Sequence, residues 1–176
     1  RVIMPFVAGE IDDLHAQHTS WDVLAAHTGL FVAFGGAALK NSRVSPGGAV
    51  RHEVRAALAA MAARGVRFVN VSPVRDDTAD FLAARWLPIR PNADVALMLG
   101  LAHTLVVEGL HDTAFLEKYT VGFERFLPYL LGESDGCPKD ADWAANLTEI
   151  PAATIRDLTH ELAREREPRA RRGVRG

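Results

Sequence analysis

Two short apolar runs separated by an amphipathic segment place the strongest constraint on how this sequence can fold. The first run, residues 30–34 (LFVAF), is closed by Gly35 and Gly36, which is typical of a buried strand that ends in a tight turn. Residues 51–64 carry an apolar stripe at helical spacing, and residues 66–71 (VRFVNV) form a second apolar run. A strand, a helix and a strand in this order predict two parallel strands joined by a right-handed crossover.

The pattern continues toward the C-terminus. We expect a short helix over residues 76–84, a weak third strand over 86–89, and a long helix over 91–108. The long helix is apolar nearly all round and should therefore be deeply buried. Further helices are predicted over residues 20–27, 112–119, 123–131, 139–147 and 151–165. The predicted fold class is α/β, with a Rossmann-like parallel sheet flanked by helices and a helical C-terminal part.

The composition is that of an ordinary globular domain. Of the 176 residues, 48% are hydrophobic and 24% are charged, which excludes disorder for the body of the chain. No apolar run is long enough to cross a bilayer, so no membrane span is expected. The single cysteine, Cys137, excludes an intramolecular disulfide framework and a cysteine-rich metal site within this chain.

The net charge of −2 hides an uneven distribution of charge along the chain. Residues 164–176 (REREPRARRGVRG) contain six arginines and two glutamates, and removing this +4 leaves −6 for residues 1–163. An acidic body argues against nucleic acid as a partner. We expect residues 164–176 to form a solvated, disordered end.

Polar and charged residues follow each predicted strand. In a parallel sheet, ligands bind beyond the carboxyl ends of the strands, where the loops lead into helices. Glycines allow a close backbone approach, and Lys, Asn, Ser and Arg side chains suit phosphate oxygens. The candidate binding residues are Gly35, Gly36, Lys40, Asn41 and Ser42 in the first loop, Ser72, Pro73 and Arg75 in the second, and Arg90, Asn92 and Asp94 in the third.

Each of these loops also has a purely structural interpretation. The paired glycines can form a tight turn, Asn92 and Asp94 can cap a helix, and the arginines can pair with nearby aspartates. The three loops share one sheet edge, and this favours a nucleotide-type site. Neither G-x-G-x-x-G nor a P-loop is present, which counts against an ordinary nucleotide-dependent dehydrogenase.

Nothing in the sequence predicts a catalytic residue or a metal ligand. His15 and His18 lie three residues apart, but no third ligand completes a zinc site. Cys137 precedes a proline in a polar loop, and we interpret it as a bystander thiol. The G-x-S-x-G signature of a serine nucleophile is absent.

Over residues 1–163 the sequence strongly resembles the molybdopterin oxidoreductases of the dimethyl sulfoxide reductase family. Within that family it is most similar to biotin sulfoxide reductases and related S- and N-oxide reductases. The resemblance is carried by residues 30–48 (LFVAFGGAALKNSRVSPGG), 65–81 (GVRFVNVSPVRDDTADF) and 86–136, and extends to residues 2–21. It implies molybdenum bound by two molybdopterin guanine dinucleotides, and reduction of an S-oxide or N-oxide by oxygen-atom transfer.

The resemblance also implies roles for the candidate residues. All eleven match cofactor loops of the family, but Ser72 stands where many relatives have Asp, and Ala93 stands where they have Thr. Asp94 is expected to accept hydrogen bonds from the N1 and N2 donors of guanine. Arg43 replaces a residue that is often Gln, and no residue of this chain matches the serine that ligates molybdenum.

Because this family is several times longer than 176 residues, the chain is expected to be an internal fragment that is inactive alone. Residues 1–163 are expected to form the α/β domain that binds molybdopterin guanine dinucleotide, and residues 164–176 a tail foreign to the family. The implied partners are the remainder of the parent reductase and a small S-oxide or N-oxide substrate. The compartment, cytoplasm or periplasm, stays open. The alternative is a non-catalytic nucleotide-binding or scaffold α/β module.

Overall fold

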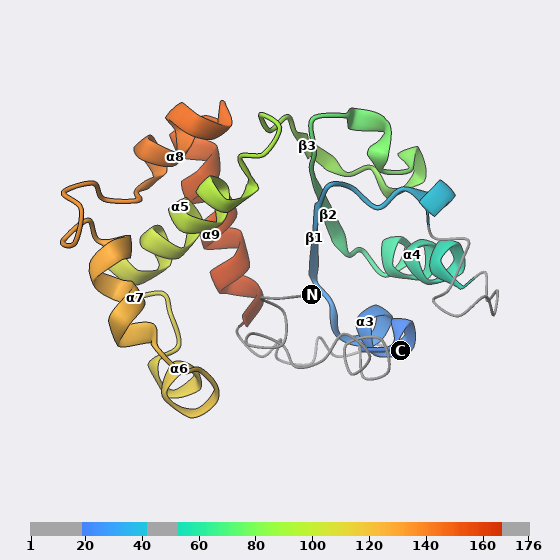
Figure 1. Ribbon diagram of the computed structural model, residues 1–176. Coiled ribbons are helices and arrows are strands. Elements are labelled where there is room, and N and C mark those ends of the chain that lie inside the picture. The colour runs from blue at the N-terminus through green and yellow to red at the C-terminus, as the bar shows by residue number, and fades with distance from the viewer. Residues whose placement is uncertain (1–18, 42–52, 167–176) are drawn as a thin grey trace.

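The computed structural model describes residues 19–41 and 53–166, and its centre is a three-stranded parallel sheet (Figure 1). The strands β1 (Leu30–Phe34), β2 (Arg67–Val71) and β3 (Arg85–Leu87) lie side by side in the order β1-β2-β3. Helix α4 (Val54–Ala63) lies between β1 and β2 in the chain. The predicted parallel strand–helix–strand unit is therefore confirmed.

Three of the described helices begin after residues whose side chains cap them. Helix α3 (Trp21–His27) begins after Ser20, whose hydroxyl accepts a hydrogen bond from the Val23 amide. Asp112 and Asp140 cap the helices that follow them in the same way, because each carboxylate accepts a backbone amide hydrogen bond three residues ahead. The helices of the C-terminal part are α5 (Asp94–Val107), α6 (Thr113–Tyr119), α7 (Phe123–Leu130), α8 (Ala141–Thr148) and α9 (Ala152–Arg166).

The predicted helix over residues 76–84 is wrong. Two short 3₁₀ helices, η2 (Arg75–Asp77) and η3 (Asp80–Leu82), take its place. Between them Thr78 is extended and forms an isolated parallel bridge with Ala37. This pairing with the loop after β1 interrupts the helix, since a bridged residue cannot keep helical dihedral angles.

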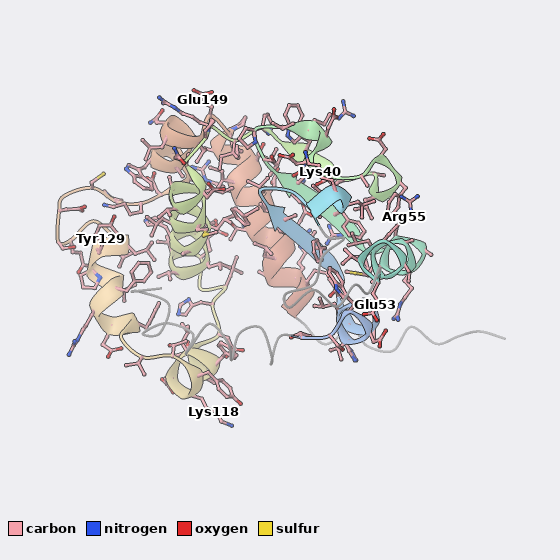
Figure 2. All side chains as sticks on the ribbon, turned by 45° about the vertical axis from the view of Figure 1, so that its right-hand side comes forward. Lys40, Glu53, Arg55, Lys118, Tyr129 and Glu149 are labelled. Atoms are coloured by element: carbon pink, nitrogen blue, oxygen red, sulfur yellow. The ribbon has the colours of Figure 1, made fainter. Side chains whose placement is uncertain are left out.

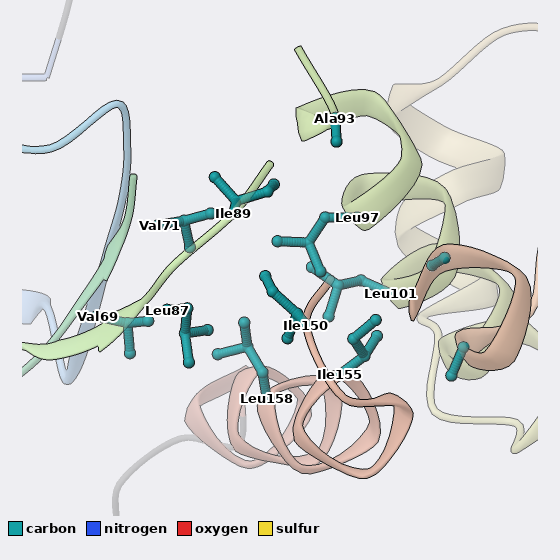
Figure 3. Close-up of a cluster of buried hydrophobic side chains, with 12 residues drawn as sticks. Val69, Val71, Leu87, Ile89, Ala93, Leu97, Leu101, Ile150, Ile155 and Leu158 are labelled. Atoms are coloured by element: carbon teal, nitrogen blue, oxygen red, sulfur yellow. The ribbon is translucent and has the colours of Figure 1, made fainter. Parts of the chain in front are cut away.

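The sheet is buried on both faces, and side chains of β2 alternate between two apolar cores. Val69 and Val71 face α5 and α9, where they join the cluster drawn in Figure 3. Phe68 faces the opposite way, toward Leu58 and Met61 of α4. The arrangement is therefore three layers, with α3 and α4 on one face of the sheet and α5, α8 and α9 on the other (Figure 1).

Helix α5 is buried on one side only, so the expectation that this apolar helix is deeply buried is wrong. Its buried residues, which include Leu97 and Leu101, face α8 and α9. Val95 is 67% exposed and Val107 is 61% exposed. The described part of the chain therefore leaves an apolar side of α5 in contact with solvent.

Helix α9 continues three residues past the expected domain boundary at residue 163. Glu165 lies 2.9 Å from Arg67, and Glu161 pairs with Arg67 and Arg85 at 2.7 and 2.8 Å. These ion pairs hold the end of α9 against the amino ends of β2 and β3. Residues 167–176 lie outside the described residues, and the domain division itself stays a prediction. No helix within residues 19–41 and 53–166 is both long and apolar enough to cross a membrane.

A buried lysine fixes the loop between α7 and α8. The Lys139 side chain is 3% exposed, and its ammonium lies 2.6 Å from the Asp135 carboxylate and 4.4 Å from the centre of the Tyr129 ring. It also donates a hydrogen bond to the Cys137 carbonyl. Figure 2 shows Tyr129 on α7, beside this loop. A buried ammonium needs such partners, because burial without them would be costly.

This ion pair should make stability depend on pH. The Lys139 hydrogen bond and the Cys137 amide lower the pKa of Asp135 below its ordinary 3.8. Burial lowers the pKa of Lys139, but the hydrogen bond and charge of Asp135 outweigh it and raise that pKa overall. A carboxyl with a depressed folded-state pKa stabilises the fold above its unfolded-state pKa, and this is lost as the pH falls through the folded-state value. The Tm of Asp135→Asn should therefore lie below wild type at about pH 6 and converge with it below pH 3.8.

Thermal unfolding followed by circular dichroism measures this pH dependence. Glu133→Gln removes an exposed carboxylate from the same loop and is the control for net charge. A constant Tm difference between wild type and Asp135→Asn at all pH values would contradict the expected role of the pair.

The contact between α5 and α8 depends on Gly100. A Cβ atom at this position would lie 2.6 Å from the Ala144 Cβ. We expect Gly100→Ala to lower the free energy of unfolding by about 1–3 kcal/mol because of overpacking, although alanine is the better helix former by about 1 kcal/mol. Urea denaturation measures this loss, and adding Ala144→Gly should recover most of it. A Gly100→Ala chain as stable as wild type would contradict the close packing.

Candidate functional site

The three loops that the sequence singled out start side by side at one edge of the sheet. The register pairs Phe34 with Val71, and Val71 with Leu87. Beyond these residues the Gly35 amide donates to the Val71 carbonyl at 2.8 Å, and the Ser72 amide donates to the Leu87 carbonyl at 3.3 Å. We call residues 35–41, 72–78 and 88–94 the carboxyl edge.

The two glycines of the first loop differ in the space around their Cα atoms. Both have positive φ, +76° at Gly35 and +81° at Gly36. A Cβ at Gly36 would lie 2.4 Å from the Asp77 Cβ and from its carbonyl oxygen, whereas a Cβ at Gly35 would meet no described atom within 4 Å. Gly36 therefore allows the first loop to pack on the second, which is a structural role, and Gly35 leaves open space at the edge.

The rest of the first loop is a 3₁₀ helix, η1 (Leu39–Asn41). Lys40 lies on this helix, as Figure 2 shows, and is exposed. Asn41 ends the helix, and Ser42 lies outside the described residues. Of the polar side chains predicted for this loop, the structure thus places Lys40 at the edge.

Ser72 is fully buried, and its hydroxyl is engaged within the second loop. The hydroxyl donates to the Asp77 carboxylate (Oδ2) at 2.7 Å and accepts from the Val74 amide at 3.2 Å. The Ser72 carbonyl accepts from the Trp86 indole at 2.8 Å. Ser72 therefore shapes the loop and orients Asp77, while Pro73 and Arg75 are exposed.

Sequence reasoning missed Asn70 and Asp77. The Asn70 residue is 1% exposed, and its side-chain amide donates a hydrogen bond to the Arg75 carbonyl at 3.1 Å. This hydrogen bond ties the second loop to β2. The side-chain carbonyl oxygen of Asn70 has no hydrogen-bond partner among the described residues. Asn70 also lines a cavity of about 60 Å³ together with Arg75, Thr78 and Asp80. A polar residue inside the apolar run of β2 was the signal for Asn70. No local motif marked Asp77.

The third loop carries Arg90, Asn92 and Asp94 into the start of α5. The Arg90 amide donates to the Thr148 carbonyl at 3.0 Å, and Asn92 has a positive φ of 64°. The residue before the first turn is Ala93, and within the described residues no side-chain hydrogen bond caps α5. Asn92 and Asp94 thus do not act as caps. Arg90 is exposed and Asp94 is half-buried in the first helical turn.

The carboxyl edge therefore combines exposed cations with carboxylates. Lys40, Arg75 and Arg90 supply hydrogen-bond donors for an anion, and Asp77 and Asp94 supply acceptors. No group of three or more His, Cys, Asp or Glu residues within residues 19–41 and 53–166 is arranged to hold a metal ion. His15 and His18 lie outside the described residues. The edge is suited to binding a ligand that offers both phosphates and hydrogen-bond donors.

The fold and this edge define a parallel α/β domain with charged loops at the carboxyl ends of its strands. No protein-family model matches the chain. The chain is 42% identical to dimethyl sulfoxide/trimethylamine N-oxide reductase of Rhodobacter capsulatus over 159 residues, and 42% identical to biotin sulfoxide reductase of Cereibacter sphaeroides over 165 residues. It is 38% identical to trimethylamine-N-oxide reductase of Haemophilus influenzae over 166 residues.

These alignments cover 90%, 94% and 94% of this chain but 19%, 22% and 20% of the three reductases. The structure is also similar to acetylene hydratase from Pelobacter acetylenicus, with a TM-score of 0.60 and 26% identity over 81% of this chain and 18% of that one. The predicted resemblance to the dimethyl sulfoxide reductase family is confirmed: the chain is similar to a segment of these S- and N-oxide reductases. It spans about a fifth of the length of these relatives.

The two glycines of the first loop provide a matched test of the edge. Gly35→Ala should cost about 1–2 kcal/mol for its left-handed backbone. Gly36→Ala should cost about 1–3 kcal/mol more, because its Cβ also meets Asp77. Urea denaturation of both variants measures the difference. Equal losses would show that the first and second loops do not pack together.

Proposed function

We propose that this chain is the segment of a molybdenum S-oxide or N-oxide reductase that binds the guanine dinucleotide part of a bis(molybdopterin guanine dinucleotide) cofactor. The observation that carries the proposal is the coincidence of two independent features. The alignments with the reductases cover nine tenths of the chain, and its charged loops share one edge of a parallel sheet. Such an edge is where nucleotides bind in open α/β sheets.

The side chains of the carboxyl edge fit the chemistry of a guanine nucleotide. Asp94 is half-buried in the first turn of α5 and makes no cap hydrogen bond within the described residues, so its carboxylate is available to the N1 and N2 donors of guanine. Lys40, Arg75 and Arg90 are exposed cations for the diphosphate. The residues proposed to contact the nucleotide are Gly35, Lys40, Asn41, Ser42, Pro73, Arg75, Arg90, Asn92 and Asp94. Gly36 and Ser72, which the sequence also singled out, shape the loops that carry them.

The reaction proposed for the whole enzyme is the two-electron reduction of an S-oxide or N-oxide to the sulfide or amine, with two protons and release of water. When bound, the molybdenum centre supplies the acceptor for the oxygen atom. The residues of this chain contribute by binding and orientation: they fix the distal, guanine end of the cofactor. Because these contacts are the same in the ground state and in the transition state, they determine how much cofactor is bound but do not change the rate of the chemical step.

Guanine recognition by Asp94 can be tested with two nucleotides. The chain should bind guanosine diphosphate in isothermal titration calorimetry, and bind inosine diphosphate, which lacks the N2 amino group, about tenfold more weakly. Asp94→Asn should weaken guanosine diphosphate binding and remove most of this discrimination.

Asp157→Asn removes an exposed carboxylate from α9 and is the matched control, which should bind both nucleotides as wild type does. Thermal unfolding checks that each variant is folded. A folded wild-type chain without saturable guanosine diphosphate binding would favour the non-catalytic scaffold module instead.

A further inference from the structure

Asp77 occupies an unusual position between two loops of the carboxyl edge. It ends the 3₁₀ helix η2, six residues beyond the last residue of β2. Its carbonyl oxygen and Cβ pack closely against Gly36 of the first loop. Any side chain at position 36 would collide with them, because its Cβ would lie 2.4 Å from each. Asp77 is therefore held where the loops after β1 and β2 meet.

The Asp77 carboxylate is oriented from within the protein. The buried Ser72 hydroxyl donates to Oδ2 at 2.7 Å, and because this hydroxyl also accepts from the Val74 amide, its proton is directed at Asp77. The other oxygen, Oδ1, has no hydrogen-bond partner within residues 19–41 and 53–166, and the residue is half-buried. One oxygen thus fixes the side chain while the other is available to a ligand.

We propose that Asp77 binds the ribose hydroxyls of the nucleotide, with Ser72 as its positioning residue. Ribose hydroxyls are donors, and a carboxylate at the end of the second strand of a nucleotide-binding sheet accepts hydrogen bonds from them. At that strand end Ser72 is buried and uncharged, so the carboxylate comes from Asp77, five residues later in the chain. The inference rests on the proposed nucleotide binding and adds the residue that recognises the ribose.

The test compares guanosine diphosphate with its 2′,3′-dideoxy analogue by isothermal titration calorimetry on the full chain. Wild type should bind the ribose form at least about tenfold more tightly, as expected for a hydrogen bond to a charged acceptor. Asp77→Asn keeps the size and the acceptor for Ser72 but removes the charge, and its preference for ribose should fall below about threefold.

Asp76→Asn is the matched control, because it removes an exposed carboxylate from the same 3₁₀ helix and changes the net charge equally. It should retain the wild-type preference. Ser72→Ala keeps every charge and removes only the orienting hydroxyl, so its ribose preference should lie between those of wild type and Asp77→Asn. Partial unfolding would weaken the binding of both nucleotides equally, so it would not change the ratio of their affinities. Thermal unfolding identifies variants that are not folded.

The outcomes separate this inference from the function on which it rests. If wild type binds neither nucleotide, the proposed nucleotide binding fails and the role of Asp77 fails with it. If wild type binds guanosine diphosphate but does not distinguish the dideoxy analogue, or if folded Asp77→Asn keeps the full preference, the role of Asp77 alone is overturned.

Discussion

The whole arrangement depends on the burial of β2 from both sides. Val69 and Val71 pack on α5 and α9, and Phe68 packs on α4. Because the strand also pairs with β1 and β3, it is enclosed in all four directions perpendicular to its axis. Such a strand has little freedom in register, since a shift by one residue would exchange its two faces and turn the polar Asn70 side chain toward the apolar cluster on α5 and α9. The fixed register then aligns the ends of all three strands.

Alignment of the strand ends does not by itself make a site, and the loops need their own internal contacts. Three contacts hold the second loop. The Asn70 side chain donates a hydrogen bond to the Arg75 carbonyl, the Ser72 hydroxyl donates one to the Asp77 carboxylate, and Gly36 of the first loop packs against Asp77. Thr78 adds a further connection, since its hydroxyl accepts from the Ala37 amide at 3.4 Å. The first and second loops therefore behave as one packed unit, and a change in one should be felt in the other.

The sequence predicted the elements of this fold better than the contacts of its edge. Apolar runs and a cap residue such as Ser20 are local signals, and they located the strands and most helices to within a few residues. The interruption at Thr78 depends on a bridge to Ala37, 41 residues earlier, and no local pattern encodes it. The exposure of Val95 likewise depends on which elements cover α5.

The same limit applies to the site. The residue types at the strand ends predicted which loops form the carboxyl edge, but not which of their side chains make hydrogen bonds within the protein. Ser72 looks like a ligand contact in the sequence and is buried in the structure, where it orients Asp77. In the sequence, Gly36 looks like a residue that allows a ligand to approach the backbone closely. In the structure, the space beside it is filled by Asp77 of the second loop.

The mixture of charges at the carboxyl edge favours a nucleotide over simpler anions. Inorganic phosphate offers mainly acceptors, which Arg75 and Arg90 could satisfy, but it would leave the carboxylates of Asp77 and Asp94 without donors and repel them. A free base or nucleoside offers donors but no anion for the cations. A guanine nucleotide offers donors at its base and ribose and acceptors at its phosphates. Such a ligand gives each sign of charge on this edge a partner, so discrimination against simpler anions arises from the pairing of both signs rather than from the strength of either.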